Sequence, residues 1–145
     1  MANWCEGTLK LRGRAKDIAD LCNDRFNGVK AILCNNNELE ITSPDWCHVS
    51  GSNSAYIMGC NEGISFDDPH KIITMALPIQ EAYSINTGFW SILSCEYGVD
   101  IRIHAFEKGM QFEQEIEIIC GDVRVNDRIE YDDYVWESPM PLLGG

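Results

Sequence analysis

The chain has 145 residues, which suits one domain that buries about two-thirds of the surface exposed by its unfolded form. Its 23 acidic and 11 basic residues give a net charge of −12, which repels phosphate backbones and anionic membranes and so disfavours nucleic-acid binding. No run approaches the roughly 18 apolar residues of a membrane span, and the N-terminus lacks a basic segment followed by an apolar run, so we expect a cytoplasmic protein without membrane contact.

The seven cysteines indicate the same compartment. They stand at positions 5, 22, 34, 47, 60, 95 and 120, an odd number without close pairs. Small secreted disulfide scaffolds instead carry an even number of closely spaced cysteines. We therefore expect reduced thiols that pack as small apolar side chains.

The N-terminal part predicts a strand, a helix and a second strand. Polar and apolar residues alternate over Trp4–Gly13, which is typical of a strand with one buried face. From Ala15 to Phe26 apolar residues recur at three- and four-residue steps, as in an amphipathic helix, and Gly28 suits its C-terminal cap. With Val29–Cys34 as the next strand, this order predicts a βαβ unit.

The middle of the chain predicts short strands separated by turns. Asn35-Asn36-Asn37 favours a turn because asparagine tolerates positive φ. The predicted strands are Glu38–Thr42, Ala55–Met58, Ile64–Phe66 and Lys71–Leu77. Pro78 either stops sheet pairing or begins a helix, and Ile79–Ile85 could form two helical turns.

The clearest pattern is an antiparallel hairpin over Val99–Ile118, preceded by a helix that begins at Asn86 or Thr87 and ends at Gly98. A register that keeps the apolar residues on one face pairs Ala105 with Phe112, Ile103 with Gln114, Ile101 with Ile116 and Val99 with Ile118. The polar face then sets Arg102 opposite Glu115, His104 opposite Glu113 and Asp100 opposite Glu117. The last pair is repulsive, which suggests either a neighbouring cation or a splay at the ends of the strands.

The remaining residues complete the predicted fold. Val123–Val125 and Ile129–Tyr131 predict a second hairpin around Asn126-Asp127, and residues 138–145 have the composition of a flexible C-terminal tail. Two helices on one face of a mainly antiparallel sheet make an α+β fold. We expect a single α+β domain over residues 1–137, followed by the tail.

No catalytic constellation stands out, and no cofactor is expected. The weak metal-ligand candidates are Cys47, His48, Cys60 and His70. Zinc sites usually show paired ligands a few residues apart, whereas Cys47 and His48 are adjacent. A small thiol- or metal-dependent enzyme stays open as an alternative, although packed thiols and surface histidines explain the same residues.

An acidic face is the best candidate for a protein-binding site. Glu113, Glu115 and Glu117 recur every second residue of a predicted strand, so they share one face at a spacing of about 6.6–6.8 Å. Asp132 and Asp133 follow in sequence. Successive phosphates of an extended nucleic-acid strand have a similar spacing, which suggests, as an alternative function, an acidic DNA mimic that inhibits a host defence nuclease of the restriction or CRISPR type. A solvated strand face produces the same pattern.

Three short motifs resemble the YubB/Api-like family of phage and plasmid proteins. They are Asn3-Trp4-Cys5 followed by Leu9, Leu11 and Gly13; the Ala76-Leu77-Pro78 junction; and Tyr97-Gly98-Val99 through Gly109, Met110 and Phe112. The resemblance implies a ferredoxin-like domain and no known activity or catalytic residue. The expected function is that of an accessory protein of a mobile genetic element that binds another protein rather than catalysing a reaction.

Overall fold

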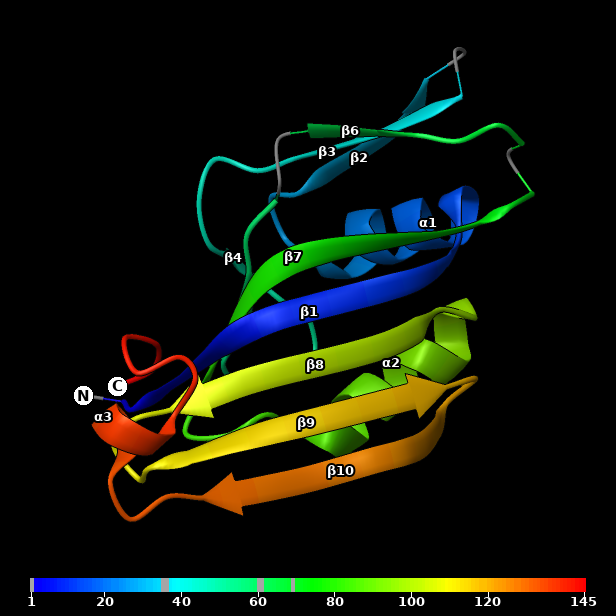
Figure 1. Cartoon of the computed structure of the whole chain (residues 1–145). Coiled ribbons are helices and arrows are strands. Elements are labelled where there is room, and N and C mark those ends of the chain that lie inside the picture. Colours follow the sequence, from blue (N-terminus) through cyan, green and yellow to red (C-terminus); the bar gives the residue numbers. More distant parts are fainter. Residues whose placement is uncertain (1, 35–36, 60–61, 69) are drawn as a thin grey trace.

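The computed structural model describes residues 2–34, 37–59, 62–68 and 70–145. In this part of the chain it contains ten strands and three short helices (Figure 1). In chain order they are β1 (Trp4–Arg14), α1 (Ala15–Arg25), β2 (Lys30–Cys34), β3 (Glu38–Thr42), β4 (Cys47–His48), β5 (Ala55–Ile57), β6 (Glu62–Ser65), β7 (Ile72–Ala82), α2 (Thr87–Tyr97), β8 (Asp100–Glu107), β9 (Phe112–Ile119), β10 (Asp122–Glu130) and α3 (Tyr134–Glu137).

Strand β1 lies at the centre of a seven-stranded sheet. The strand order is β10-β9-β8-β1-β7-β5-β4, and each neighbouring pair is antiparallel. The alternation in the sequence of β1 places its side chains, since Leu9 and Leu11 are fully buried whereas Lys10 and Arg12 are exposed. The sheet therefore has one apolar and one polar face.

The core lies between the apolar face and the two longer helices. α1 and α2 lie on the same side of the sheet (Figure 1). α1 buries Ile18 and Leu21, and α2 buries Trp90 and Leu93, in one cluster with the apolar residues of the strands. The opposite face of the sheet, called the outer face below, has no helix packed along it (Figure 1).

Both ends of α2 follow the sequence prediction. The Asn86 side chain accepts a hydrogen bond from the Phe89 N–H at 3.1 Å, and Gly98 closes the helix with φ of 65°. α1 and α2 have 11 residues each. Among the described residues, no helix combines the length and apolar character needed to cross a membrane.

A separate three-stranded sheet has the order β2-β3-β6. Its edge strand β2 is joined to α1 by Asn23, whose side-chain amide bonds both the N–H and the C=O of Ala31 at 2.9 Å. The chain thus leaves the main sheet after α1 and enters the small sheet at β2. In β3, Leu39 and Ile41 are fully buried, which ties the small sheet to the core.

The expected ferredoxin-like α+β fold is wrong, although α1 and α2 do share one side of the main sheet. The molecule is mostly antiparallel sheet, with a seven-stranded and a three-stranded sheet and only short helices in the described chain. The predicted βαβ unit does not form, because β2 pairs with β3 instead of returning beside β1. The sequence of β2 is mostly apolar, as an interior strand would be, yet the strand lies at the edge of the small sheet and exposes Ile32 and Leu33.

Three local predictions also fail. β7 continues through Pro78 to Ala82, so the residues after Pro78 form strand and not helix. The predicted hairpin around Asn126-Asp127 is a single strand, β10, paired with β9. Gly28 has a positive φ of 96°, but α1 ends with Phe26 at the cap. Of the predicted Asn35–Asn37 turn, positions 35 and 36 lie outside the described residues.

The β8–β9 hairpin forms with its apolar residues on one face, but its register differs from the predicted one by two residues. Ile101 lies opposite Ile118, and Ala105 opposite Gln114. Glu107 extends β8 toward the turn because its buried carboxylate accepts hydrogen bonds from the N–H groups of Gly109 and Met110, at 2.5 and 2.7 Å. The alternation in the sequence determines which face each residue of a strand occupies. The hydrogen bonds of Glu107 determine where the turn lies and therefore which residues of β8 and β9 pair.

Candidate functional site

The acidic residues of β9 share the outer face, as the sequence predicts. Glu113, Glu115 and Glu117 alternate with residues that face the core, such as Ile116 and Ile118. Glu113 is nearly enclosed, since its side chain is only 10% exposed. The side chains of Glu115 and Glu117 are 45% and 31% exposed. The row is therefore not uniformly open to a partner.

These carboxylates contact cationic or hydrogen-bonding groups of the protein itself. His104 Nε2 lies 2.5 Å from one oxygen of Glu113, and the Tyr131 hydroxyl donates to the other at 2.7 Å. Burial and the hydrogen bond with Glu113 raise the pKa of Tyr131 to about 12. Arg102 lies between the other two carboxylates, 3.9 Å from Glu115 and 3.5 Å from Glu117.

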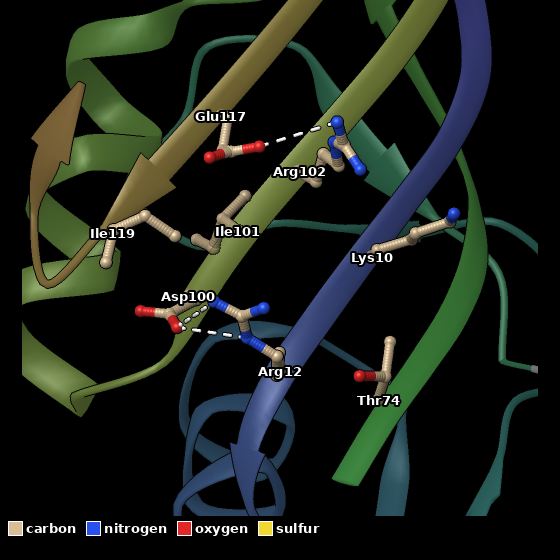
Figure 2. Close-up of a pocket in the computed structure, with 8 residues that line it drawn as sticks. All are labelled: Lys10, Arg12, Thr74, Asp100, Ile101, Arg102, Glu117 and Ile119. Atoms are coloured by element: carbon tan, nitrogen blue, oxygen red, sulfur yellow. Dashed lines mark hydrogen bonds and ion pairs between the residues drawn. The ribbon is translucent and has the colours of Figure 1, made fainter. Parts of the chain in front are cut away.

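The ion pairs continue along a hollow of about 260 Å³ on the outer face (Figure 2). Its lining comprises Lys10, Arg12, Thr74, Asp100, Ile101, Arg102, Glu117 and Ile119. Arg12 bonds Asp100 through two nitrogens, at 2.8 and 3.2 Å. The predicted pairing of Asp100 with Glu117 does not form, because the register places Glu117 opposite Arg102. Lys10 is the exception, because it forms no ion pair within the described chain. The charges of the hollow largely cancel, so it offers neither a run of free carboxylates nor a strong cationic site.

Asp132 and Asp133 lie apart from the β9 row, in the turn between β10 and α3. The Asp133 carboxylate caps α3 by accepting the Trp136 N–H at 3.4 Å. Tyr131 lies between the β9 row and α3. Its hydroxyl donates a hydrogen bond to Glu113, and its ring contacts that of Tyr134 edge-on at a centroid distance of 5.8 Å. The five predicted residues thus belong to two neighbouring places and not to one face.

Four exposed apolar side chains lie on the short helix α3 or in the segment that follows it. They are Val135, Trp136, Met140 and Leu142, with 63%, 86%, 45% and 93% of their surface exposed, and we call them the C-terminal patch. The helix and the final segment lie together at one end of the sheet (Figure 1). Sequence reasoning counted only the acids here, although Asp132–Glu137 also contains a tryptophan among acidic residues, which was the available signal.

The backbone under the C-terminal patch is held by buried contacts. Tyr134 is 2% exposed, and its hydroxyl donates to the carbonyl oxygen of Leu143 at 2.8 Å. Its own N–H donates to the Gln111 side chain at 3.1 Å. The Gly145 N–H reaches the carbonyl oxygen of Trp4 at 3.0 Å. Hydrogen bonds therefore hold the backbone that carries the C-terminal patch. The flexibility predicted for residues 138–145 stays a prediction.

The thiol and metal candidates do not converge. Cys47 is buried and faces the core, whereas His48, its neighbour in β4, points to the other face and contacts the ring of Tyr56 edge-on at a centroid distance of 5.4 Å. Cys60 lies outside the described residues, and His70 is exposed in the connection before β7. Among the residues that the structure describes, no group of three or more His, Cys, Asp or Glu side chains could hold a metal ion.

A buried polar cluster joins the sheet to the start of α2. Glu81 accepts hydrogen bonds from Asn86 N–H at 3.2 Å and from Trp90 Nε1 at 3.4 Å. Gln114 accepts the Ile85 N–H at 2.8 Å and the Cys5 thiol at 3.9 Å. Burial, reinforced by two nearby carboxylates, raises the pKa of Cys5 to about 12. This thiol therefore stays protonated and is no nucleophile at neutral pH.

Glu81 predicts a specific dependence of stability on pH. Burial raises its pKa above 4.5, against the opposing effect of its hydrogen bonds from Trp90 and Asn86. A raised carboxyl pKa stabilises the fold below the unfolded pKa, and that contribution is lost as pH rises through the folded pKa. Urea unfolding from about pH 4 to about pH 8 should show that Glu81→Gln gains stability relative to wild type as pH rises. A constant difference between the two proteins would contradict the assignment.

Comparison with protein-family models, curated proteins and solved structures finds no match. The resemblance to the YubB/Api-like family therefore stays a prediction, and the ferredoxin-like fold that it implied is not present.

Proposed function

We propose that the protein acts by binding another protein through the C-terminal patch. The observation that carries this proposal is the 86% exposure of Trp136 on a helix whose base is fixed by Tyr134. The contact of a large apolar side chain with water is unfavourable, and a partner that covers the side chain removes this cost. Tryptophan is also one of the residue types enriched among the binding hot spots of protein interfaces. Because the supporting backbone is bonded, little conformational entropy is lost on binding.

The resemblance supports the wider proposal of an accessory protein of a phage or plasmid that works in the host cytoplasm. The two alternatives have less support from the geometry. A DNA mimic needs a row of available carboxylates, but Glu113, Glu115 and Glu117 are engaged by His104 and Arg102. A thiol- or metal-dependent enzyme needs its reactive side chains together, and Cys47 and His48 point to opposite faces.

Quantitative affinity purification from bacterial host lysate tests the proposal, with wild-type and Trp136→Ala proteins as paired baits. A specific partner should be recovered by wild type and reduced by at least about tenfold with Trp136→Ala, because the central aromatic anchor is lost. Trp136 contributes little to the core, so the variant should unfold within about 0.5 kcal/mol of wild type.

The matched control is Ile92→Ala, which removes another exposed apolar side chain (65% exposed) from α2. This bait should recover the same partner as wild type. Equal recovery by Trp136→Ala and wild type would show that any partner binds elsewhere, and loss with both variants would indicate non-specific apolar capture.

A further inference from the structure

The C-terminal segment combines exposed apolar residues with charge of one sign. Residues 129–145 contain four acids and neither lysine nor arginine. The same segment carries five exposed large apolar side chains, those of Ile129 and the C-terminal patch. Of the four acids, Glu130 pairs with Arg128 at 3.3 Å, whereas Asp132, Asp133 and Glu137 form no ion pair within the described residues.

The acids beside Trp136 differ from those of β9 in lacking cationic partners. Asp132, Asp133 and Glu137 are exposed, and none of them forms an ion pair within the described residues. Asp133 and Glu137 do bond backbone N–H groups, those of Trp136 and Asp132 respectively. Their negative charge therefore remains available to a partner, whereas that of Glu115 and Glu117 is offset by Arg102.

We infer that the partner of the C-terminal patch presents an apolar pocket for Trp136 bordered by lysine or arginine side chains. This inference rests on the proposed function and specifies the chemistry of the partner. Two copies of the chain cannot satisfy it, because their facing patches would place acids against acids in molecules of net charge −12. Nucleic acids and anionic membranes are repelled for the same reason.

The two kinds of residue should affect binding differently. Trp136 enters the pocket and controls dissociation, while the acidic border steers association and makes it sensitive to salt. Asp132 is the best charge probe, since Asp133 and Glu137 also hold the backbone of α3 and its turn. The control is Asp67, a remote acid that is 96% exposed in the connection between β6 and β7 and lies 3.7 Å from Lys71, so that its substitution makes the same change in net charge away from the C-terminal patch.

A random peptide library selected in parallel on wild type and Trp136→Ala provides a probe without a known partner. Peptides that require Trp136 should be enriched in Lys and Arg beside aromatic or aliphatic residues. One such peptide should bind Asp132→Asn about threefold more weakly and Asp67→Asn as well as wild type, and raising salt from about 50 to about 500 mM should weaken it at least about tenfold.

The possible results separate this inference from the proposed function. The cationic pocket would be overturned, and protein binding left intact, if the Trp136-dependent peptides showed no excess of Lys and Arg. The same would follow if Asp132→Asn and Asp67→Asn lost peptide affinity equally. The absence of Trp136-dependent peptides would overturn both. Trp136-dependent sedimentation with phosphatidylcholine vesicles would overturn the inference in favour of a lipid surface.

Discussion

The Ile101→Asp variant should lose about 4 kcal/mol or more of its free energy of unfolding, measured by urea denaturation. Ile101 is 1% exposed on the core face of β8, opposite Ile118 of β9. The substitution removes about 2–3 kcal/mol of apolar burial and places a carboxylate where no cation faces it. The combined cost is a large fraction of the stability of a domain of this size.

Arg102→Ala is the matched control on the neighbouring position of the same strand. Arg102 faces outward, is 54% exposed and lies at 3.5 Å or more from its two carboxylate partners. Its replacement should cost under about 1 kcal/mol. Equal destabilisation by the two substitutions would mean that the two faces of β8 are reversed.

Gly7→Ala should cost about 3 kcal/mol, because β1 and β8 approach closely at this residue. A Cβ atom on Gly7 would overlap the backbone carbonyl oxygen of His104 and lie 2.7 Å from Ala105 Cα. The two central strands of the sheet would have to separate, since backbone atoms cannot rotate away as a side chain does. Thermal and urea unfolding of the variant measure this cost.

Gly13→Ala tests the same substitution in the same strand without the overlap. The nearest atom to a Cβ at Gly13 is Val99 Cγ2 at 3.5 Å, an ordinary contact. This variant should be within about 1 kcal/mol of wild type, or slightly more stable because alanine restricts the unfolded chain. A comparable loss for both glycine variants would indicate that β1 and β8 are not packed as described.

Local patterns were sufficient to predict several elements. β3 occupies Glu38–Thr42 as expected, and α2 begins after Asn86 and ends at Gly98. In these elements the strand alternation or the capping residues act within a few positions, so neighbours in sequence carry the information. The faces of β1 and β9 were also predicted correctly, because the period of two is a property of the strand itself.

The arrangement of the strands depends on contacts distant in sequence. Pro78 was expected to stop sheet pairing or to begin a helix, but it lies opposite Thr8 of β1, and its carbonyl oxygen accepts the Met58 N–H at 3.1 Å. Such pairing with two other segments overrides a local preference. The βαβ expectation failed similarly, because β3 was available to pair with β2.

The candidate site shows the same division. Alternation predicted correctly that Glu113, Glu115 and Glu117 share a face, and it set Arg102 and His104 of the neighbouring strand beside them. It could not show that the register shifts by two residues, which places Glu117 opposite Arg102, or that Glu113 is nearly enclosed. Trp136 was missed because only the acids of Asp132–Glu137 were considered, whereas the exposure of its side chain follows from the contacts of Tyr134 with Gln111 and Leu143. The exposure of the Trp136 side chain can be inferred only when the contacts of Tyr134 are known.

The dissociation constant of a Trp136-dependent partner tests the central claim most directly. Isothermal titration of wild type, Trp136→Ala and Ile92→Ala with the same purified partner gives the three values under one condition. We predict an increase of at least about 30-fold for Trp136→Ala, equivalent to about 2 kcal/mol, and less than about threefold for Ile92→Ala. Equal dissociation constants for wild type and Trp136→Ala would contradict binding through the C-terminal patch.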